Sequence, residues 1–454
     1  MIFLKRRRLI FWLVKAYVKK WQKTIFFFFA LGLVFFFTLR FLFAYFSNKI
    51  PFVNKTIVGV MGTYTTDNIP DDILSKASRG LTQIAEDGTP KPDVASSWEI
   101  KNDGKKYIFH LKKNVYFSNG SKLDSGSIRY SFLDVKEERP DKNTIVFILK
   151  DSYAPFLITV SRPIFKNGFV GVGDYKVKGI NLNGNFIQGI DLASKKNDYD
   201  LISYQMYPTE DALKTAYALG EVTVASGLSS LEIQKTKFSN FKNTTLQKKE
   251  DNQHLVTVFY NTQDKILSDK RIRQALTYAL PEKFIEGKRN FGPFAPNSWI
   301  GDEFYLTNQQ DIEHAKTLLS NASSATSGGE LKIELKTLSK FKTTADELKK
   351  AWSVIGIKTE IKIVNGMPSS YQALLADFRV PKDPDQYTLW HSEQQNNITN
   401  YKNLRIDKLL EDGRKTVDID KRQKIYSDFQ KYLLDDAPAS FLYFPYEYDI
   451  SRKN

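Results

Sequence analysis

The sequence predicts an α/β protein with at least two lobes, preceded by one transmembrane helix. The chain of 454 residues is longer than the about 250 to 300 residues at which a single hydrophobic core stops growing. Residues 331–364 read as strand, helix and strand, and residues 25–46 form one apolar run. Hydrophobic residues at 42% and charged residues at 26% are typical of a folded chain rather than a disordered one.

The strand–helix–strand segment is predicted from two periodicities. In "LKIELKTL" every second residue is apolar, which indicates a strand. The segment after it places four apolar residues on one helix face, Leu348, Ala351, Trp352 and Ile355. Gly356 ends this helix in the usual position for a C-terminal cap, and "IKTEIKIV" follows as a second strand. Together they predict a βαβ unit with parallel strands.

Elements on either side complete the α/β pattern. Residues 80–132 predict short strands separated by the turn signals Asp87-Gly88, Asp103-Gly104 and Asn119-Gly120. A helix is expected at "DIEHAKTLLS", before the low-complexity loop "NASSATSGG". Two charged helices are expected within residues 403–436, followed by a final apolar strand in "PASFLYFPYEYDI".

The apolar run at residues 25–46 predicts a membrane-spanning helix. Arg40 is its single charged residue, and a helix of this length spans the roughly 30 Å hydrocarbon core. Arg40 lies near the end, where its side chain reaches the headgroups. A cleaved signal peptide is the alternative, but "FAYFSNK" has large aromatic residues where a peptidase requires small ones. We therefore predict an uncleaved anchor.

Charge asymmetry orients this helix. Four lysines precede it closely (Lys15, Lys19, Lys20 and Lys23), whereas Lys49 and Lys55 follow it. The positive-inside rule makes residues 1–24 a cytoplasmic basic segment and places the bulk of the chain outside the cell membrane. The basic segment suits either a helix on the anionic inner leaflet or a simple topology signal.

Composition excludes several function classes. The formal net charge is +15, but residues 1–50 contain ten basic and no acidic residues, which leaves +5 for the rest of the chain. So small a remainder does not favour nucleic-acid binding. The absence of cysteine excludes disulfides, thiolate metal sites and cysteine nucleophiles.

The chain shows no motif for catalysis. Its four histidines, His110, His254, His314 and His391, lack partners at metal-ligand spacing. Phosphate-binding, hydrolase and zinc-protease signatures are absent, and "GVGDYK" carries two glycines without the third of a nucleotide loop. We expect no enzyme, no cofactor and no metal site, although a glycosidase is not excluded by motif.

The segment "FYNTQDKILSDKRIRQALTYALPEKF", residues 259–284, combines a strand end, a loop and an amphipathic helix. Four residues form its apolar face, Ile272, Ala275, Leu276 and Ala279. Ser268 or Asp269 is available as N-cap, and Pro281 closes the run. Its first turn carries three basic residues, Lys270, Arg271 and Arg273. They oppose the helix dipole unless they find acidic partners.

This segment resembles the signature of the family 5 extracellular solute-binding proteins, the oligopeptide, dipeptide and nickel receptors of ABC importers. In that family "NT" is followed by "D-x-R-V-R-Q-A-L-x-Y-A". Further similar segments occur in the family's order, among them "YAPFL", "GVGDY", "ALGEVTVASGL", "LKKAWSVIGIKTEIKIV", "DPDQY" and "DDAPASFLYF". They cover nearly all of residues 75–445. The chain departs from the family in lacking the lipobox cysteine, so the helix at residues 25–46 would replace the lipid as tether.

The resemblance implies a two-lobed, periplasmic-binding-protein-like (type II) clamshell with an inserted β-rich subdomain. Lobe I would comprise residues 50–78, 162–254 and 440–454, the inserted subdomain residues 79–161, and lobe II residues 255–439. The crossings "HLVTVFYN" and "FLYFPYEY" would be the hinge strands. The implied function is capture of short peptides between the lobes and their delivery to an ABC permease.

The resemblance also implies ligand-binding residues, because in peptide-binding relatives an aspartate near "DP" pairs with the α-amino group of the ligand. Asp383 is the first candidate for this role and Asp385 the second. Three aromatic residues would wall in side chains (Tyr387, Trp390 and Tyr401), Asn400 would bond a peptide group, and Tyr64 would contribute from lobe I. The alternatives are that Asp383-Pro384 starts a turn and that the aromatic residues are core.

Other functions stay open at this point. A membrane-anchored sensor or interaction domain would keep the same fold without a permease. A sugar or metal-chelate receptor would use the same scaffold for another solute, although the absence of clustered histidines disfavours free metal ions.

Overall fold

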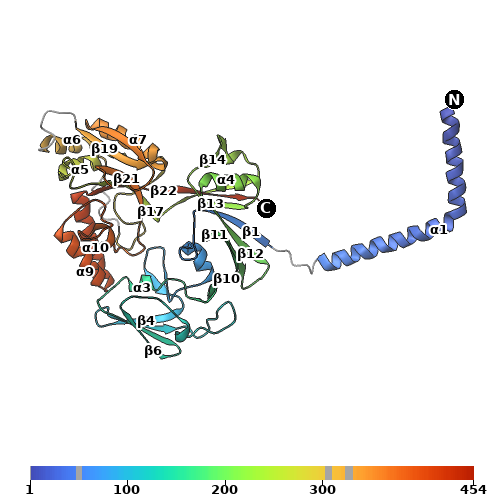
Figure 1. Ribbon diagram of the computed structural model, residues 1–454, viewed down its shortest axis with the longest axis horizontal. Helices are drawn as coiled ribbons and strands as arrows, with labels where there is room; N and C mark the ends of the chain where they lie inside the picture. Colours follow the sequence, from blue (N-terminus) through green and yellow to red (C-terminus); the bar gives the residue numbers. More distant parts are fainter. Residues whose placement is uncertain (1, 48–53, 302–308, 323–330, 454) are drawn as a thin grey trace. The chain divides into compact units, whose positions relative to one another are not determined.

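The computed structural model describes residues 2–47, 54–301, 309–322 and 331–453. The chain divides into two compact units, Met1–Lys55 and Thr56–Asn454. The first unit consists mainly of α1 (Ile2–Ser47), which Figure 1 draws in blue as a long helix with a bend. Within it, Lys15–Leu42 contains an 18-residue window with a mean hydropathy of 2.4, none of which is buried. It is the one described helix that is long and apolar enough to cross a membrane, a property that a signal sequence shares.

The second unit, which we call the outer unit, is built on a mixed sheet. Twelve strands of its described residues pair in the order β10-β11-β12-β1-β13-β22-β17-β21-β19-β20, with β16 and β18 also paired to β22. On one side of the sheet's middle are β1 (Asn54–Met61), β10 (Tyr175–Asn183), β11 (Phe186–Ser194), β12 (Asp200–Tyr207), β13 (Val224–Leu228) and β16 (Thr244–Glu250). On the other are β17 (His254–Tyr260), β18 (Gly287–Arg289), β19 (Lys332–Leu338), β20 (Lys358–Val364) and β21 (Ala373–Arg379). We call these two sets the first and second half-sheets.

Strand β22 (Ala439–Arg452) belongs to both half-sheets. Its first part pairs with β17 and β18, and its last part pairs with β13 and β16. The change of partners falls at Pro445, which pairs with Gly287, and Tyr446, which pairs with Glu250. Figure 1 shows β22 running between the two halves. One unbroken strand therefore joins them.

The carboxyl ends of the parallel strands point toward this crossing from both sides. In the second half-sheet β19 is parallel to both β20 and β21, and β17 is antiparallel to β21 with His254 opposite Arg379. In the first half-sheet β1 is parallel to β13, whose last residue Leu228 lies opposite Tyr448 of β22. We call this region of strand ends, together with the start of β17, the hinge edge.

A separate antiparallel sheet is inserted between the strands of the first half-sheet. It has the order β4-β5-β7-β6 and comprises β4 (Ala95–Lys101), β5 (Lys106–Leu111), β6 (Val135–Asp141) and β7 (Thr144–Leu149). The hairpin β2 (Thr82–Ile84) and β3 (Pro90–Pro92) precedes it. Its core is aromatic, with Tyr107, Phe109 and Phe147 inaccessible to solvent and in ring contact with one another or with Phe156.

Helices cover the sheets. They are α2 (Asp71–Ala77), α3 (Phe156–Thr159), α4 (Glu210–Leu219), α5 (Lys270–Tyr278), α6 (Ile312–Asn321), α7 (Lys342–Val354), α8 (Tyr387–Trp390), α9 (Leu404–Lys415) and α10 (Ile419–Asp436). Short strand pairs complete the unit, β8 (Phe165–Lys166) with β9 (Val170–Gly171) and β14 (Glu232–Ile233) with β15 (Thr236–Lys237).

The described core lies entirely in the outer unit. The buried apolar residues run from Ile69 to Ile450, and nearly all of them fall into five clusters. One cluster, from Leu81 to Val172, belongs to the inserted sheet and its neighbours. Because none of these residues comes from α1, we expect the outer unit to fold without the N-terminal helix.

The predicted βαβ unit is confirmed. Strands β19 and β20 pair in parallel from Lys332 opposite Lys358 to Leu338 opposite Val364. Helix α7 connects them and buries Leu348 and Trp352 against the sheet. The helix expected at "DIEHAKTLLS", the two charged helices and the final strand correspond to α6, α9, α10 and β22.

The basic residues in the first turn of α5 have acidic or carbonyl partners. Asp269 is the N-cap and accepts a hydrogen bond from the amide of Arg271. Lys270 pairs with Asp435 and Asp436 at 2.5 and 3.2 Å. The buried Arg273 donates to the carbonyls of Leu267, Ser268, Asp436 and Ala437. Lys270 and Arg273 attach α5 to the end of α10, and these contacts offset their unfavourable position in the helix dipole.

Candidate functional site

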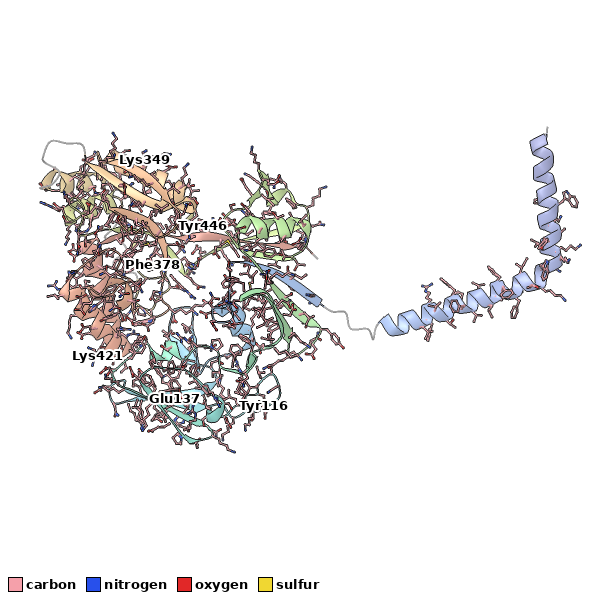
Figure 2. The ribbon with its side chains drawn as sticks, viewed as in Figure 1. Tyr116, Glu137, Lys349, Phe378, Lys421 and Tyr446 are labelled. Carbon is pink, nitrogen blue, oxygen red and sulfur yellow. The ribbon has the colours of Figure 1, made fainter. Side chains whose placement is uncertain are left out.

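The hinge edge is the region where this fold is expected to bind a ligand. In open α/β sheets, ligands bind outside the carboxyl ends of the strands, at a point where the strand order reverses. Here the strand ends of two half-sheets meet beside two crossing segments, β22 and the connection from β16 into β17. Figure 2 labels two residues of this region, Phe378 near the end of β21 and Tyr446 in β22.

A cavity of about 190 Å³ lies beside this edge. Four segments distant in sequence line it: the β2–β3 turn (84–88), the residues before β17 (252 and 253), the loop after β18 (294–298) and the loop after β21 (380–384). Drug-sized ligands occupy about 300 to 1,000 Å³. The cavity therefore suits a small solute, or one end of a longer one.

The walls of the cavity are joined by hydrogen bonds between the inserted sheet's hairpin and the second half-sheet's loops. Asn297 Nδ2 donates to the carbonyl of Glu86 at 2.7 Å, and the amide of Trp299 donates to the carbonyl of Asp87 at 3.0 Å. Gly88 has φ +86°, and a Cβ there would lie 2.7 Å from the carbonyl oxygen of Lys382. Only glycine permits both this turn and this close approach.

Charges of both signs line the cavity. Glu86 and Asp87 lie on the hairpin side, and the exposed Lys382 lies on the other. Hydrogen bonds from the side chain and amide of Thr89 lower the pKa of Asp87 below its ordinary value. Asp87 is consequently ionised at neutral pH. The arrangement matches a solute that carries both an amino and a carboxylate group.

Polar pairs flank the cavity along the hinge edge. Arg379 Nη2 lies 3.3 Å from Asp71 Oδ2, which belongs to α2 of the opposite half, and 3.2 Å from Oε1 of Gln253. Lys340 Nζ contacts both carboxylate oxygens of Asp377 at 2.9 and 3.0 Å. These groups lie at the start of α2, just after β19, at the end of β21 and just before β17.

A histidine–aspartate pair marks the entry into β17. His254 Nδ1 lies 2.6 Å from Asp251 Oδ2. The hydrogen bond to Asp251 raises the pKa of His254, against the opposing effect of burial. Burial raises the pKa of the neighbouring Glu447, and the Asp251 carboxylate adds to this effect.

The structure places Asp383 away from the role predicted for it. Its side chain is 10% exposed and pairs with Arg422, whose Nη1 and Nη2 lie 2.8 and 2.5 Å from the two carboxylate oxygens. Its Oδ1 also accepts the amide of Asp385, as expected for a turn. The prediction that Asp383 pairs with the α-amino group of a ligand is therefore not supported, because a bidentate pair with Arg422 already satisfies this carboxylate in the interior.

Asp385 also forms a buried ion pair with an arginine. Its carboxylate is 8% exposed and lies 2.9 Å from Nε of Arg414. Burial raises the pKa of Asp385, and the Arg414 charge offsets part of this effect. The guanidinium of Arg414 lies over the rings of Tyr387 and Tyr153, at 4.4 and 5.3 Å. The loop after β21 thus turns its acidic residues inward and presents Val380, Pro381, Lys382 and Pro384 to the cavity.

Two of the predicted aromatic residues belong to the core. Trp390 is 1% exposed, and its Nε1 donates to Gln386 at 2.7 Å. Tyr401 is 5% exposed, and its hydroxyl donates to Asp436. Both pack in the cluster behind the second half-sheet. Their burial supports the alternative interpretation, in which these aromatic residues belong to the core.

The other three predicted residues keep accessible surface. Tyr64 follows β1, and its hydroxyl donates to the carbonyl of Met61 at 2.8 Å. Burial raises the pKa of Tyr64. Tyr387 is half-buried and stacks on His391. Asn400 is exposed, with its Nδ2 3.0 Å from Oδ1 of Asn261. Their role in binding stays a prediction.

Sequence reasoning missed most of the cavity. The Asp87-Gly88 signal predicted a turn but not its contact with the loop after β21, because the two are almost 300 residues apart. Arg379 ends β21, a strand that the sequence analysis did not predict and whose burial does not alternate. Inspection of the carboxyl ends of parallel strands selects Arg379 only once β21 is known.

Comparison with solved structures defines the class. The chain is similar to the ABC transporter substrate-binding protein CtaP of Listeria monocytogenes, with 20% identity, a TM-score of 0.72 and coverage of 88% of this chain and 94% of that one. It is also similar to NikZ of Campylobacter jejuni in complex with Ni(L-His), with 21% identity, a TM-score of 0.70 and coverage of 89% and 95%. The fold is that of the two-lobed, type II periplasmic binding proteins, as predicted.

The family follows from the sequence. Residues 89–392 match the model of the bacterial extracellular solute-binding proteins, family 5, and the chain belongs to this family. It is 25% identical to the oligopeptide-binding protein AppA of Bacillus subtilis, with 84% of this chain and 83% of that protein covered. It is 24% identical to the nickel-binding periplasmic protein of Escherichia coli, with 81% and 83% covered. The relatives are binding proteins, so the prediction that this chain is not an enzyme is confirmed.

Proposed function

We propose that the protein is a membrane-tethered, extracytoplasmic receptor that captures short peptides between two lobes and delivers them to an ABC permease. The cavity at the hinge edge carries this proposal, since it brings acidic groups of the inserted sheet's hairpin and a basic group of the loop after β21 together beside the crossing into β17. Peptide binding is also the activity named for several relatives, including the oligopeptide-binding protein of B. subtilis and the di/tripeptide-binding protein 1 of Pseudomonas aeruginosa.

In this proposal lobe I comprises residues 50–78, 162–254 and 440–454, the inserted subdomain residues 79–161, and lobe II residues 255–439. The distribution of core clusters supports the main divisions, because two clusters fall in residues 255–444 and two in residues 57–246 and 448–450, although residues 441–444 pack with lobe II. The crossings at β17 and β22 act as the hinge strands. Helix α1 acts as the tether.

The amino end of the peptide is assigned to the hairpin side of the cavity. Glu86 and Asp87 are the acidic residues of the lining, whereas Asp383 and Asp385 are held by arginines. The carboxylate of Asp87 already accepts two hydrogen bonds from Thr89 at 2.9 and 2.6 Å, which fixes its orientation. Glu86 is exposed and able to turn toward a ligand. Tyr64, Tyr387 and Asn400 are retained as candidates for contacts farther along the peptide.

The test is to identify what the full-length protein binds. Protein purified in lipid nanodiscs is denatured, and the released small molecules are identified by mass spectrometry, with nickel measured in parallel. We expect short peptides, and calorimetry with a randomised tripeptide pool should then give a saturable heat. Release of a sugar or a nickel chelate without peptides, or absence of heat with the pool, would contradict the proposal.

A further inference from the structure

Residues 2–24 form a part of α1 to which peptide capture and tethering assign no role. Helix α1 has 46 residues, and at 1.5 Å per residue it is about 69 Å long. The hydrocarbon core of a bilayer is about 30 Å thick, and residues 25–46 alone are long enough to span it. The helix therefore continues well beyond the span. Figure 1 shows that it also bends.

The spacing of residue types gives this extension two different faces. The apolar face carries five residues at helical spacing, Ile10, Val14, Tyr17, Val18 and Trp21. The basic face carries three lysines at every fourth position, Lys15, Lys19 and Lys23. Because a helix turns by about 100° per residue, the two faces point about 160° apart. The extension is amphipathic along its last four turns.

A topology signal explains the basic face but not the apolar one. The positive-inside rule depends on Lys and Arg alone. Tyr17, Val18 and Trp21 are exposed on the described helix, and the five described core clusters contain no residue of α1. Removing apolar side chains from water is favourable. This face therefore calls for a partner.

The charge of the extension indicates which partner fits. Residues 1–24 contain eight basic residues and no acidic residue. A second copy of the helix would bring the same charge and be repelled. A nucleic acid would match the charge but leave the apolar face uncovered. An anionic lipid surface matches both, because its phosphates attract lysines and its acyl chains receive apolar side chains.

The aromatic residues are also of the types found at membrane surfaces. Tyr17 and Trp21 lie on the apolar face, and Trp and Tyr are enriched at the level of the lipid headgroups. Trp12 departs from the pattern, since it falls on the basic face. Its ring lies 5.9 Å from Nζ of Lys15, and a tryptophan beside a lysine suits the same headgroup level.

We propose that residues 10–24 lie along an anionic phospholipid surface as an interfacial helix, with the apolar face toward the acyl chains and the basic face toward the headgroups and water. The inference rests on the part of the proposed function in which residues 25–46 span the membrane. It goes beyond that function because it gives the chain a second ligand, anionic phospholipid. Lipid bound here fixes the depth at which the span enters the bilayer.

Spin labels on the full-length protein in nanodiscs test the two faces, and the absence of cysteine permits labelling at single positions. Tyr17→Cys and Lys19→Cys place nitroxides on the apolar and the basic face at almost the same point along the helix. Accessibility to oxygen and to a water-soluble nickel chelate measures the depth of each label. Both leaflets of a nanodisc have the same lipid composition, so the orientation of the span does not affect the result.

Nanodiscs of phosphatidylcholine with phosphatidylglycerol should bury the Tyr17→Cys label by about 5 to 10 Å and leave the Lys19→Cys label accessible to the chelate. In phosphatidylcholine alone the Tyr17→Cys label should move toward water. The same shift is expected in about 1 M salt, where the Debye length falls to about 3 Å.

Matched charge variants in the Tyr17→Cys background show whether the lysines attract the lipid. Lys15→Gln/Lys20→Gln/Lys23→Gln should abolish most of the burial that depends on phosphatidylglycerol. Lys112→Gln/Lys113→Gln/Lys349→Gln removes the same charge from exposed positions of the outer unit and should leave the burial unchanged. Trp21→Ser tests the apolar face and should also move the label toward water.

Three results would overturn the inference. Chelate access to both labels in every lipid would leave residues 10–24 as a topology signal. Equal burial of both labels, with or without phosphatidylglycerol, would extend the span toward Lys15. Dipolar coupling between Tyr17→Cys labels in nanodiscs that hold two copies would make a second copy the partner. None of these results bears on peptide capture, which the analysis of bound molecules tests separately.

Discussion

The buried pair of Asp383 and Arg422 gives the sharpest stability prediction. The two side chains are 10% and 7% exposed, and two hydrogen bonds of 2.5 and 2.8 Å join them. Arg422 also donates through Nε to the carbonyl of Gly413 at 2.7 Å and lies over the rings of Trp299 and Tyr426. The pair therefore connects the loop after β21 to helices α9 and α10. Asp383→Asn removes the negative charge and leaves that of Arg422 in place.

The expected loss is about 3 kcal/mol of unfolding free energy. Removing one partner of a buried ion pair costs about 3 to 5 kcal/mol, because the remaining charge is desolvated and uncompensated. The lower end applies here, since an asparagine oxygen still accepts one bond and Arg422 keeps its bond to the Gly413 carbonyl. The adjacent carboxylate raises the pKa of Arg422 above its ordinary value, against the effect of burial. The substitution removes this support, but a guanidinium is not deprotonated in proteins, so a buried charge is left without its partner.

Urea unfolding of residues 54–454, followed by tryptophan fluorescence, measures this loss. Asp412→Asn is the matched control, because Asp412 forms an exposed pair with Lys408 on α9 and should change stability by no more than about 0.5 kcal/mol. The double variant Asp383→Asn/Arg422→Met should recover part of the loss, since no charge is left buried. The reasoning is refuted if Asp383→Asn unfolds within about 1 kcal/mol of wild type and instead loses peptide binding.

Three further predictions concern other parts of the molecule. Gly88→Ala should destabilise the outer unit more than Gly120→Ala. Both glycines have positive φ, where alanine costs about 1 to 2 kcal/mol, but only at Gly88 does the new Cβ meet a carbonyl oxygen, since Gly120 has nothing within 4 Å. Equal losses of unfolding free energy in urea titrations would show that the backbone moves to relieve the contact at Gly88. The raised pKa of His254 means that its pair with Asp251 stabilises fully below the ordinary histidine pKa of 6.5 and that this contribution disappears as pH rises through the raised value. Wild type should therefore lose up to about 1 kcal/mol more than Asp251→Asn between about pH 6 and pH 8.5, and a wild type that gains stability over this range would disprove the sign. Protease treatment of intact cells should release nearly the whole outer unit from an uncleaved α1, and recovery of a soluble protein with a mature N-terminus between Ala44 and Lys49 would exclude the anchor.

The sequence predicted those elements whose cause is local. The alternation in β19, the apolar face of α7 and the αL glycine after it, Gly356 at φ +82°, depend on neighbours a few residues apart. The crossing strands were predicted through the family resemblance, and the type II fold is confirmed. Periodicity carries this information because a helix or strand buries one face whatever lies against it.

The site was predicted less well, because its contacts join distant segments. The local sequence around an aspartate in a loop does not show whether its carboxylate faces water or a guanidinium. The partner of Asp383 lies 39 positions farther along, on α10. Trp390 and Tyr401 are large aromatic residues that suit a ligand wall and a core equally. Their burial was decided by the packing of α8, α9 and α10 behind the sheet. The cavity itself needs four loops to be placed together.

The course of β22 has a consequence for how the protein is made. Strand β1 is the first of the outer unit to be synthesised, and β22, which both half-sheets require, is the last. Neither half-sheet can close while the chain is still emerging, so the inserted sheet, whose strands are all present early, is the part able to fold during synthesis. If α1 directs export, most of the outer unit crosses the membrane as an incomplete polypeptide. A stop codon only a few residues before Pro445 would then leave both halves with exposed strand edges, and the product would be a substrate for proteases rather than a shortened receptor.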